Sequence, residues 1–133
     1  MLDHVSIQCA DVALSSEFYD AVLRALGDGR VLDFGSVIGY GAAGDASFWL
    51  GPLAGGSPNR ELHIAFQARD RVEVDRFFEA AVGIGAVVLH EPRLWPEYDP
   101  DYYGTFVRDP DGNNVEAVCR TPPGVDVSRG GVP

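Results

Sequence analysis

The sequence predicts an α+β fold made of two tandem βαβββ units. The main observation is an internal repeat, in which residues 2–27 and 61–86 match at a constant offset of 59 residues. In each copy an alternating apolar pattern, typical of a half-buried strand, is followed by apolar residues at helical spacing. The residues that match are His4 with His63, Gln8 with Gln67, Asp11 with Asp70, Phe18 with Phe77 and Ala21 with Ala80.

Each copy begins with a strand and continues into a helix. Polar His4, Ser6 and Gln8 alternate with apolar residues in the first copy. Asp11 and Asp70 stand before the two helical patterns, where a short acidic side chain can accept hydrogen bonds from free backbone N–H groups. Glycines near residues 27 and 83 are expected to end the helices.

The rest of each copy is predicted to be β-structure, with an irregular loop over residues 92–100. The motif Asp109-Pro-Asp-Gly112 is expected to be the turn of a closing hairpin. One domain is expected over residues 1–120, with repeats near 1–51 and 61–120, a linker at 51–60 and a flexible tail at 121–133. The further strands are expected at 30–34, 37–41, 46–50, 86–91, 103–108 and 113–119.

Composition excludes several classes of function. The 133 residues carry a formal net charge of −10, and all ten basic residues are arginines. Lysine-dependent chemistry, such as a Schiff base or a P-loop, is therefore ruled out. Nucleic acids and anionic membrane surfaces are not expected as partners, because a protein needs a basic face to bind either of them.

The sequence favours a cytoplasmic setting. It shows neither a signal peptide nor an apolar run long enough to cross a membrane. Cys9 and Cys119, the two cysteines, lie in apolar stretches and are expected to be reduced and buried.

Three side chains form a candidate metal site. His4 and His63 occupy the same position of the repeat, and Glu116 is an acidic residue within an apolar strand, where it needs a partner. Two imidazoles and one carboxylate form the ligand set used by non-haem Fe(II), and by Mn(II) or Zn(II) with additional ligands. The alternative is that both histidines are ordinary strand residues.

The hairpin predicts which side chains face Glu116. With a four-residue turn, Thr105 opposes Glu116 and Tyr103 opposes Val118, so both share its face. Tyr103 is then a candidate for proton exchange with a substrate, or a rim aromatic that only packs. Gln8 and Gln67 are candidates for substrate donors or for hydrogen bonds between strands. His90 is expected to be a surface residue.

The paired units and the closing sequence, from Arg108 to Glu116, resemble the vicinal oxygen chelate superfamily. The motifs that carry this resemblance are Asp3-His4-Val5, Leu62-His63-Ile64-Ala65-Phe66 and Asp109-Pro-Asp-Gly-Asn-Asn-Val-Glu116. This superfamily includes glyoxalases, extradiol dioxygenases and bleomycin-resistance proteins. The resemblance implies that the two units form a half-barrel cup around a divalent metal held by His4, His63 and Glu116.

The resemblance also implies a fourth ligand position in the first repeat. Aligning Gly44 with Gly112 places Phe48 there, and neither Phe48 nor the adjacent Trp49 can bind a metal. A glyoxalase reaction that needs a glutamate base at that position is therefore disfavoured. The expected walls of the substrate site are Phe48, Trp49, Tyr40 and Trp95, and the loop that contains Trp95 is either a lid or a packed surface loop.

Two functions follow from the resemblance. The first is a metal-dependent lyase, isomerase or ring-cleaving dioxygenase, using Fe, Mn, Zn or Ni, that chelates a small substrate through adjacent oxygens. The alternative is a metal-free small-molecule binding protein of the bleomycin-resistance type. Family precedent implies a homodimer in both cases.

Overall fold

The computed structural model describes residues 1–58 and 60–125, and it contains the two predicted βαβββ units. The first unit consists of β1 (Val5–Cys9), α1 (Val12–Arg24), β2 (Gly29–Asp33), β3 (Ile38–Ala42) and β4 (Asp45–Pro52). The second consists of β5 (His63–Gln67), α2 (Arg71–Gly83), β6 (Val88–Leu94), β7 (Tyr103–Arg108) and β8 (Asn114–Cys119). The tail expected to be flexible lies mostly outside the described residues.

The two units have the same sheet topology. The strand order is β1-β4-β3-β2 in one sheet and β5-β8-β7-β6 in the other. In each, the first strand pairs in parallel with the last, and the remaining pairs are antiparallel. The α+β class and the repeat are therefore confirmed, and neither sheet closes into a barrel.

The helices begin where the sequence predicts. The side chain of Asp11 accepts a hydrogen bond from the N–H of Leu14 at 3.0 Å. Asp70 accepts the equivalent bond from Glu73 at 2.9 Å. Both therefore act as N-caps and satisfy backbone donors that the first helical turn leaves free.

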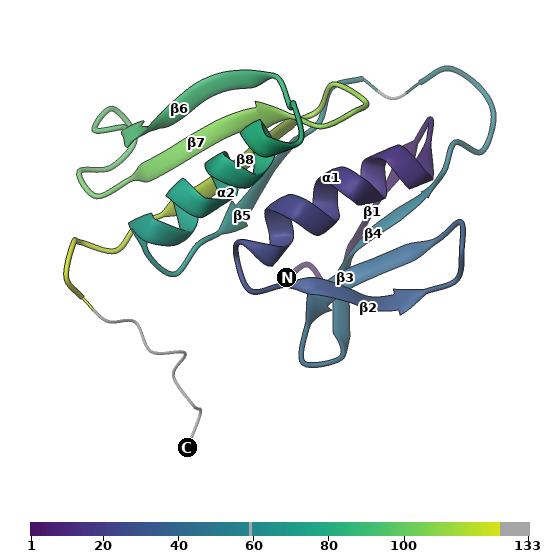
Figure 1. Cartoon of the computed structure of the whole chain (residues 1–133), viewed down its shortest axis with the longest axis horizontal. Helices are drawn as coiled ribbons and strands as arrows, with labels where there is room; N and C mark the ends of the chain where they lie inside the picture. Colours follow the sequence, from purple (N-terminus) through teal and green to yellow (C-terminus); the bar gives the residue numbers. More distant parts are fainter. Residues whose placement is uncertain (59, 126–133) are drawn as a thin grey trace.

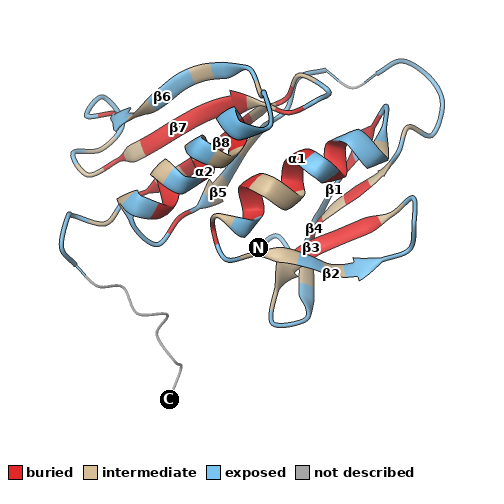
Figure 2. Ribbon diagram, viewed as in Figure 1, coloured by how far each residue is buried: buried red, intermediate tan, exposed pale blue. Residues whose placement is uncertain are grey.

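One core joins the two units. The helices contact each other between the two sheets, and each packs on its own sheet (Figure 1). Phe66 of the second unit contacts Phe48 of the first, with ring centroids 5.2 Å apart. Figure 2 shows buried residues along β3 and β7 and on the helices, and most residues of β8 are buried as well. In each sheet, the helix covers one face, and the opposite face is less covered.

The closing hairpin fastens the second unit to the first. Asp109 is buried and accepts a hydrogen bond from the hydroxyl of Tyr19 on α1 at 2.7 Å. Asp111 accepts one from the N–H of Ala10 at 3.0 Å and one from the hydroxyl of Ser15 at 3.3 Å. The motif is therefore a contact between the units as well as a turn.

The predicted register of the hairpin is wrong by one residue. Arg108 pairs with Asn114, not Asn113, and Phe106 rather than Thr105 pairs with Glu116. The loop is longer than four residues because Asn113 folds inward. Its N–H and its amide both donate to the carboxylate of Asp109, at 2.9 and 2.8 Å.

One smaller difference concerns the end of β6. Strand β6 extends to Leu94, although Pro92 favoured a loop from that residue onward. The missing N–H of Pro92 is tolerated because β6 lies at the edge of its sheet. Within the described residues, neither helix is long and apolar enough to cross a membrane.

Candidate functional site

The open face of the second sheet brings two of the three predicted metal ligands together. The Nε2 of His63, at the start of β5, lies 2.7 Å from Oε2 of Glu116 in the middle of β8. Their positions follow from the parallel pairing of β5 and β8, in which Ala65 is opposite Glu116 and His63 is two residues earlier. Because side chains alternate along a strand, His63 and Glu116 project from the same face.

Glu116 is the buried centre of this site. It is only 2% exposed, whereas the side chain of His63 is 52% exposed. The hydroxyl of Tyr102 donates a hydrogen bond to Oε1 of Glu116, so each carboxylate oxygen has its own partner. Burial without such partners would strongly disfavour the ionised carboxylate.

The pKa of Tyr102 reflects its place beside this carboxylate. Burial of the phenol raises its pKa to about 12, and the hydrogen bond to Glu116 acts in the same direction. Tyr102 therefore keeps its proton at neutral pH and acts as a fixed donor.

An open hollow lies over Glu116. It has a volume of about 480 Å³. Aromatic side chains form much of its wall, and two of them, Tyr102 and Phe106, pack with Trp95 in a small cluster separate from the main core. The residues that line the hollow are His63, Glu97, Tyr98, Tyr102, Phe106, Glu116 and Arg120.

His4 is not part of this group within one chain. Its ring lies at the exposed start of the first unit, with Nδ1 2.7 Å from the carboxylate of Asp3. Across residues 1–58 and 60–125, no three His, Cys, Asp or Glu side chains of a single chain lie together in a way that could hold a metal. The structure thus brings together His63 and Glu116, but not His4.

The expected position of Tyr103 on the Glu116 face is wrong. Tyr103 pairs with Cys119, and its hydroxyl donates to Asp75 of α2 at 2.8 Å, on the helix side of the sheet. Thr105 is also on that side, fully buried, and donates to the carbonyl oxygen of His90 at 2.8 Å. Tyr102, the neighbour of Tyr103, supplies the phenol beside Glu116 because of the one-residue difference in register.

The expected position of Phe48 is also wrong. Phe48 is buried in the core, where its ring lies 4.8 Å from that of Tyr19. The position equivalent to Glu116 is occupied by Trp49, because Ser6 pairs with Trp49 as Ala65 pairs with Glu116. Trp49 packs over Gly39, where an added Cβ would come within 2.8 Å of the indole ring.

The remaining predicted site residues lie at different distances from the hollow. Trp95 is buried, donates to the carbonyl oxygen of Gly104 at 3.1 Å, and stacks on Tyr98 at the wall. The pairing of β5 with β8 places Gln67 on the same face of the sheet as Glu116, and Gln67 is exposed there. Gln8 lines a separate small hollow beside Asp111.

Five residues that line the hollow are not among the predicted site residues. They are Glu97, Tyr98, Tyr102, Phe106 and Arg120. His90 is exposed, as expected, and its ring packs against Trp95 and Phe106 at 4.9 and 5.6 Å. The correct loop length would have placed Phe106 opposite Glu116. Arg120, two residues beyond Val118, then follows from alternation along β8.

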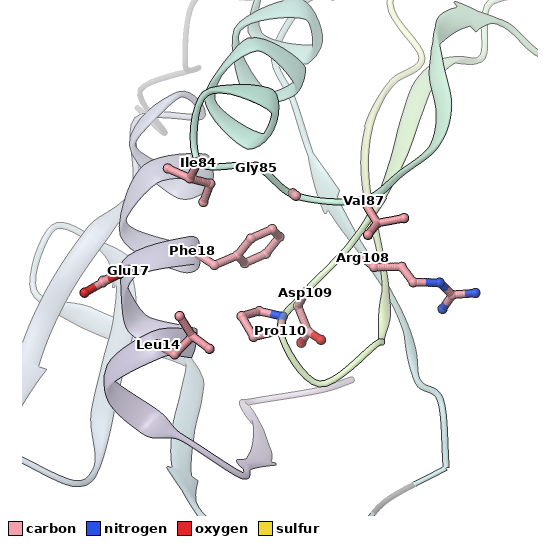
Figure 3. A pocket seen from close by; sticks show the side chains of 10 residues that line it. Leu14, Glu17, Phe18, Ile84, Gly85, Val87, Arg108, Asp109 and Pro110 are labelled. Atoms are coloured by element: carbon pink, nitrogen blue, oxygen red, sulfur yellow. The ribbon is translucent and has the colours of Figure 1, made fainter.

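A second hollow, of about 330 Å³, lies between α1, the end of α2 and the closing hairpin (Figure 3). Its lining is mainly apolar, with Leu14, Phe18 and Ile84 among its members. Its two charged neighbours in the hairpin are already engaged, since Arg108 pairs with Glu61 at 3.0 Å and Asp109 holds Tyr19. We therefore place the functional site on the open face of the second sheet.

Comparison with known proteins identifies the class. A family model described as a glyoxalase-like domain matches residues 4–118, and the chain belongs to this family. The resemblance to the vicinal oxygen chelate superfamily is thereby confirmed. No curated protein matches the chain.

Solved structures support the same fold. A glyoxalase/bleomycin resistance protein from Albidiferax ferrireducens T118 is 28% identical, with a TM-score of 0.76, covering 86% of this chain and 95% of that one. A lactoylglutathione lyase from Agrobacterium tumefaciens is 24% identical, with a TM-score of 0.61, covering 86% and 90%. A glyoxalase/bleomycin resistance protein/dioxygenase family enzyme from Burkholderia phytofirmans PsJN is 19% identical, with a TM-score of 0.67, covering 88% and 96%.

Proposed function

We propose that this protein is a metal-dependent enzyme that binds a small substrate through two adjacent oxygens, in a site completed by a second copy of the chain. The observation that carries the proposal is the contact between His63 and the buried Glu116 at the floor of an aromatic hollow. Lyase, isomerase and ring-cleaving dioxygenase chemistry all fit such a site.

The donor set on this face suits a divalent metal. An imidazole nitrogen and a carboxylate oxygen are ligands for Fe, Mn, Zn and Ni. Tyr102 holds the other oxygen of Glu116, as an outer hydrogen-bond donor does for a ligating carboxylate. When bound, the metal would act as a Lewis acid that polarises the substrate oxygens.

The third donor is proposed to be His4 of the partner subunit. His4 holds in the first unit the position that His63 holds in the second, and its side chain is 58% exposed. Both sheets have their helices on one face, which leaves the other face free to meet a second copy. In a twofold dimer the same pair of surfaces is used twice, so two equivalent sites form.

Trp49 limits the number of protein ligands that the metal can have. Since it stands where a fourth ligand would lie, the two units together offer three protein donors. Three donors leave open positions for two substrate oxygens. This favours a reaction that does not need a second glutamate at the metal.

Metal binding by the purified protein tests this proposal. After anaerobic preparation, wild-type protein is expected to bind one equivalent of Fe(II), Mn(II), Ni(II) or Zn(II) in calorimetry, and His63→Ala and Glu116→Gln are expected to lose it. His90→Ala is the matched control, because it removes a histidine of the same sheet that is outside the ligand set. Absence of binding by the wild type, or binding unchanged in both variants, would contradict the proposal.

A second candidate is a metal-free protein that binds an aromatic or cationic small molecule. Trp95 and Tyr98 favour it, because their rings are stacked with centroids 5.7 Å apart and planes 9° apart beside the hollow. The Albidiferax relative includes bleomycin resistance in its name. Ligand binding that survives both a chelator and Glu116→Gln would favour this candidate.

A further inference from the structure

Arg120 places a positive charge at the candidate site. It follows β8 directly, and it lines the same hollow as His63 and Glu116. In a chain of net charge −10, the general field repels anions, so an anionic ligand needs a specific cation close to its binding site.

The other charged residues of the hollow already have partners. Glu116 is paired with His63 at 2.7 Å, and Glu97 is paired with Arg93 at 3.1 Å. Arg120 differs, since no carboxylate in the described part of the chain lies within ion-pair distance of its guanidinium. Its charge is therefore available to a ligand.

The guanidinium is also held in place. It lies over the ring of Tyr102, 4.9 Å from the centroid. Tyr102 is itself fixed by its hydrogen bond to Glu116. A cation–π contact with a ring leaves the N–H groups of the guanidinium free, and they can donate two parallel hydrogen bonds to a carboxylate.

We propose that Arg120 binds a carboxylate of the substrate and so determines its class. The substrate would carry two adjacent oxygens, which lie at the His63 and Glu116 end of the hollow. Its apolar body would pack against Phe106 and Tyr98. Its carboxylate would bind Arg120. This inference rests on the proposed function, because it assigns the other end of the substrate to His63 and Glu116.

Two matched probes test the inference. The two are 3,4-dihydroxybenzoate and 3,4-dihydroxybenzamide, which share adjacent oxygens and differ in the negative charge. We expect the purified full-length protein to bind the benzoate about tenfold more tightly, which corresponds to one charge-assisted contact. Arg120→Gln is expected to abolish this preference, because it lowers the affinity for the benzoate alone. Arg120→Lys is expected to keep part of the preference, because it keeps the positive charge.

Controls separate this inference from the proposed function. Arg76→Gln removes the same charge from an exposed position of α2 and is expected to keep the preference. His63→Ala is expected to weaken both probes equally. If Arg120→Gln keeps the preference, or if the wild type does not prefer the benzoate or binds neither probe, the assignment of Arg120 is wrong. If His63→Ala changes the affinity for neither probe while Arg120→Gln lowers the affinity for the benzoate, the carboxylate site at Arg120 is supported and the chelating site at His63 and Glu116 is contradicted.

Discussion

Glu116 is the residue on which the candidate site depends. A carboxylate that is 2% exposed among apolar strand residues destabilises the fold unless charged or hydrogen-bonding groups reach it. Tyr102 and His63 do so, each at a different carboxylate oxygen. This arrangement fixes the direction of the carboxylate, so that the exposed ring of His63 and Oε2 of Glu116 point into one hollow.

Tyr102→Phe is expected to weaken metal binding about tenfold, because loss of an outer hydrogen bond leaves the ligating carboxylate less well oriented. Tyr103→Phe is the matched control, since it removes the same hydroxyl from the opposite face, where it bonds Asp75. Calorimetric titration of both variants measures the difference. Equal losses in the two variants would show that the effect is general destabilisation.

Stability at high pH tests the environment of the same two tyrosines. Burial, with a carboxylate partner in each case, raises the pKa of Tyr102 and of Tyr103 to about 12, while an unfolded tyrosine ionises near pH 10. Their contribution to stability is therefore complete below about pH 10 and is lost as the pH rises toward 12. Urea unfolding between pH 8 and 12 should show a steeper fall for the wild type than for the Tyr102→Phe, Tyr103→Phe double variant.

The closing hairpin is the element that connects site and fold. Its loop, residues 109–113, carries the most recognisable motif of the sequence, yet its side chains do not line the hollow over Glu116. They bind α1 and Ala10 instead, so the motif positions β8 and Glu116 relative to the first unit.

Asp109→Ala is expected to destabilise the protein by about 3 kcal/mol, because it leaves buried donors of Tyr19 and Asn113 without a partner. Asp111→Ala, which loses two less buried contacts, should cost about 1 kcal/mol. Asp45→Ala, at an exposed position of the other unit's hairpin, is the control and should change little. Urea unfolding at neutral pH gives all three values, and equal values would contradict the ranking.

The elements also show what could be predicted from the sequence. The repeat, both N-caps and the strand and helix order follow from local patterns, and the structure confirms them. The register did not follow, because the inward fold of Asn113 depends on contacts with Asp109 that a turn motif does not reveal. One residue of error moves side chains to the other face of a strand, which is why Tyr103 and Thr105 were placed beside Glu116 and Tyr102 was not.

A one-residue difference in register also decides which side chain faces the core in the first unit. Phe48 and Trp49 are adjacent, and the alignment of Gly44 with Gly112 predicts Phe48, not Trp49, at the position equivalent to Glu116. The pairing of β1 with β4 determines it, with Val5 opposite Phe48 and Ser6 opposite Trp49. Alternation along β8 places Arg120 on the same face as Glu116, but its role could not be predicted from the sequence, because that role depends on the hollow and on the absence of an acidic partner among the described residues.

At the scale of the whole molecule, the two units pack through their helices and leave their other faces open. His63 and Glu116 then belong to one unit, and His4 to the other. Because a single chain does not bring the three side chains together, the proposed metal site needs two copies of the chain, each of which supplies part of both sites.

Subunit complementation tests this claim most directly. His4→Ala and His63→Ala proteins, each expected to lack the metal site, are mixed in equal amounts under conditions that exchange subunits. About half of the dimers then carry one copy of each, and each has one intact site, so about a quarter of wild-type metal binding should return. A mixture of His63→Ala with Glu116→Gln should recover none, because both residues come from the same chain. Failure of the first mixture to recover metal binding, although mixed dimers form, would contradict the account.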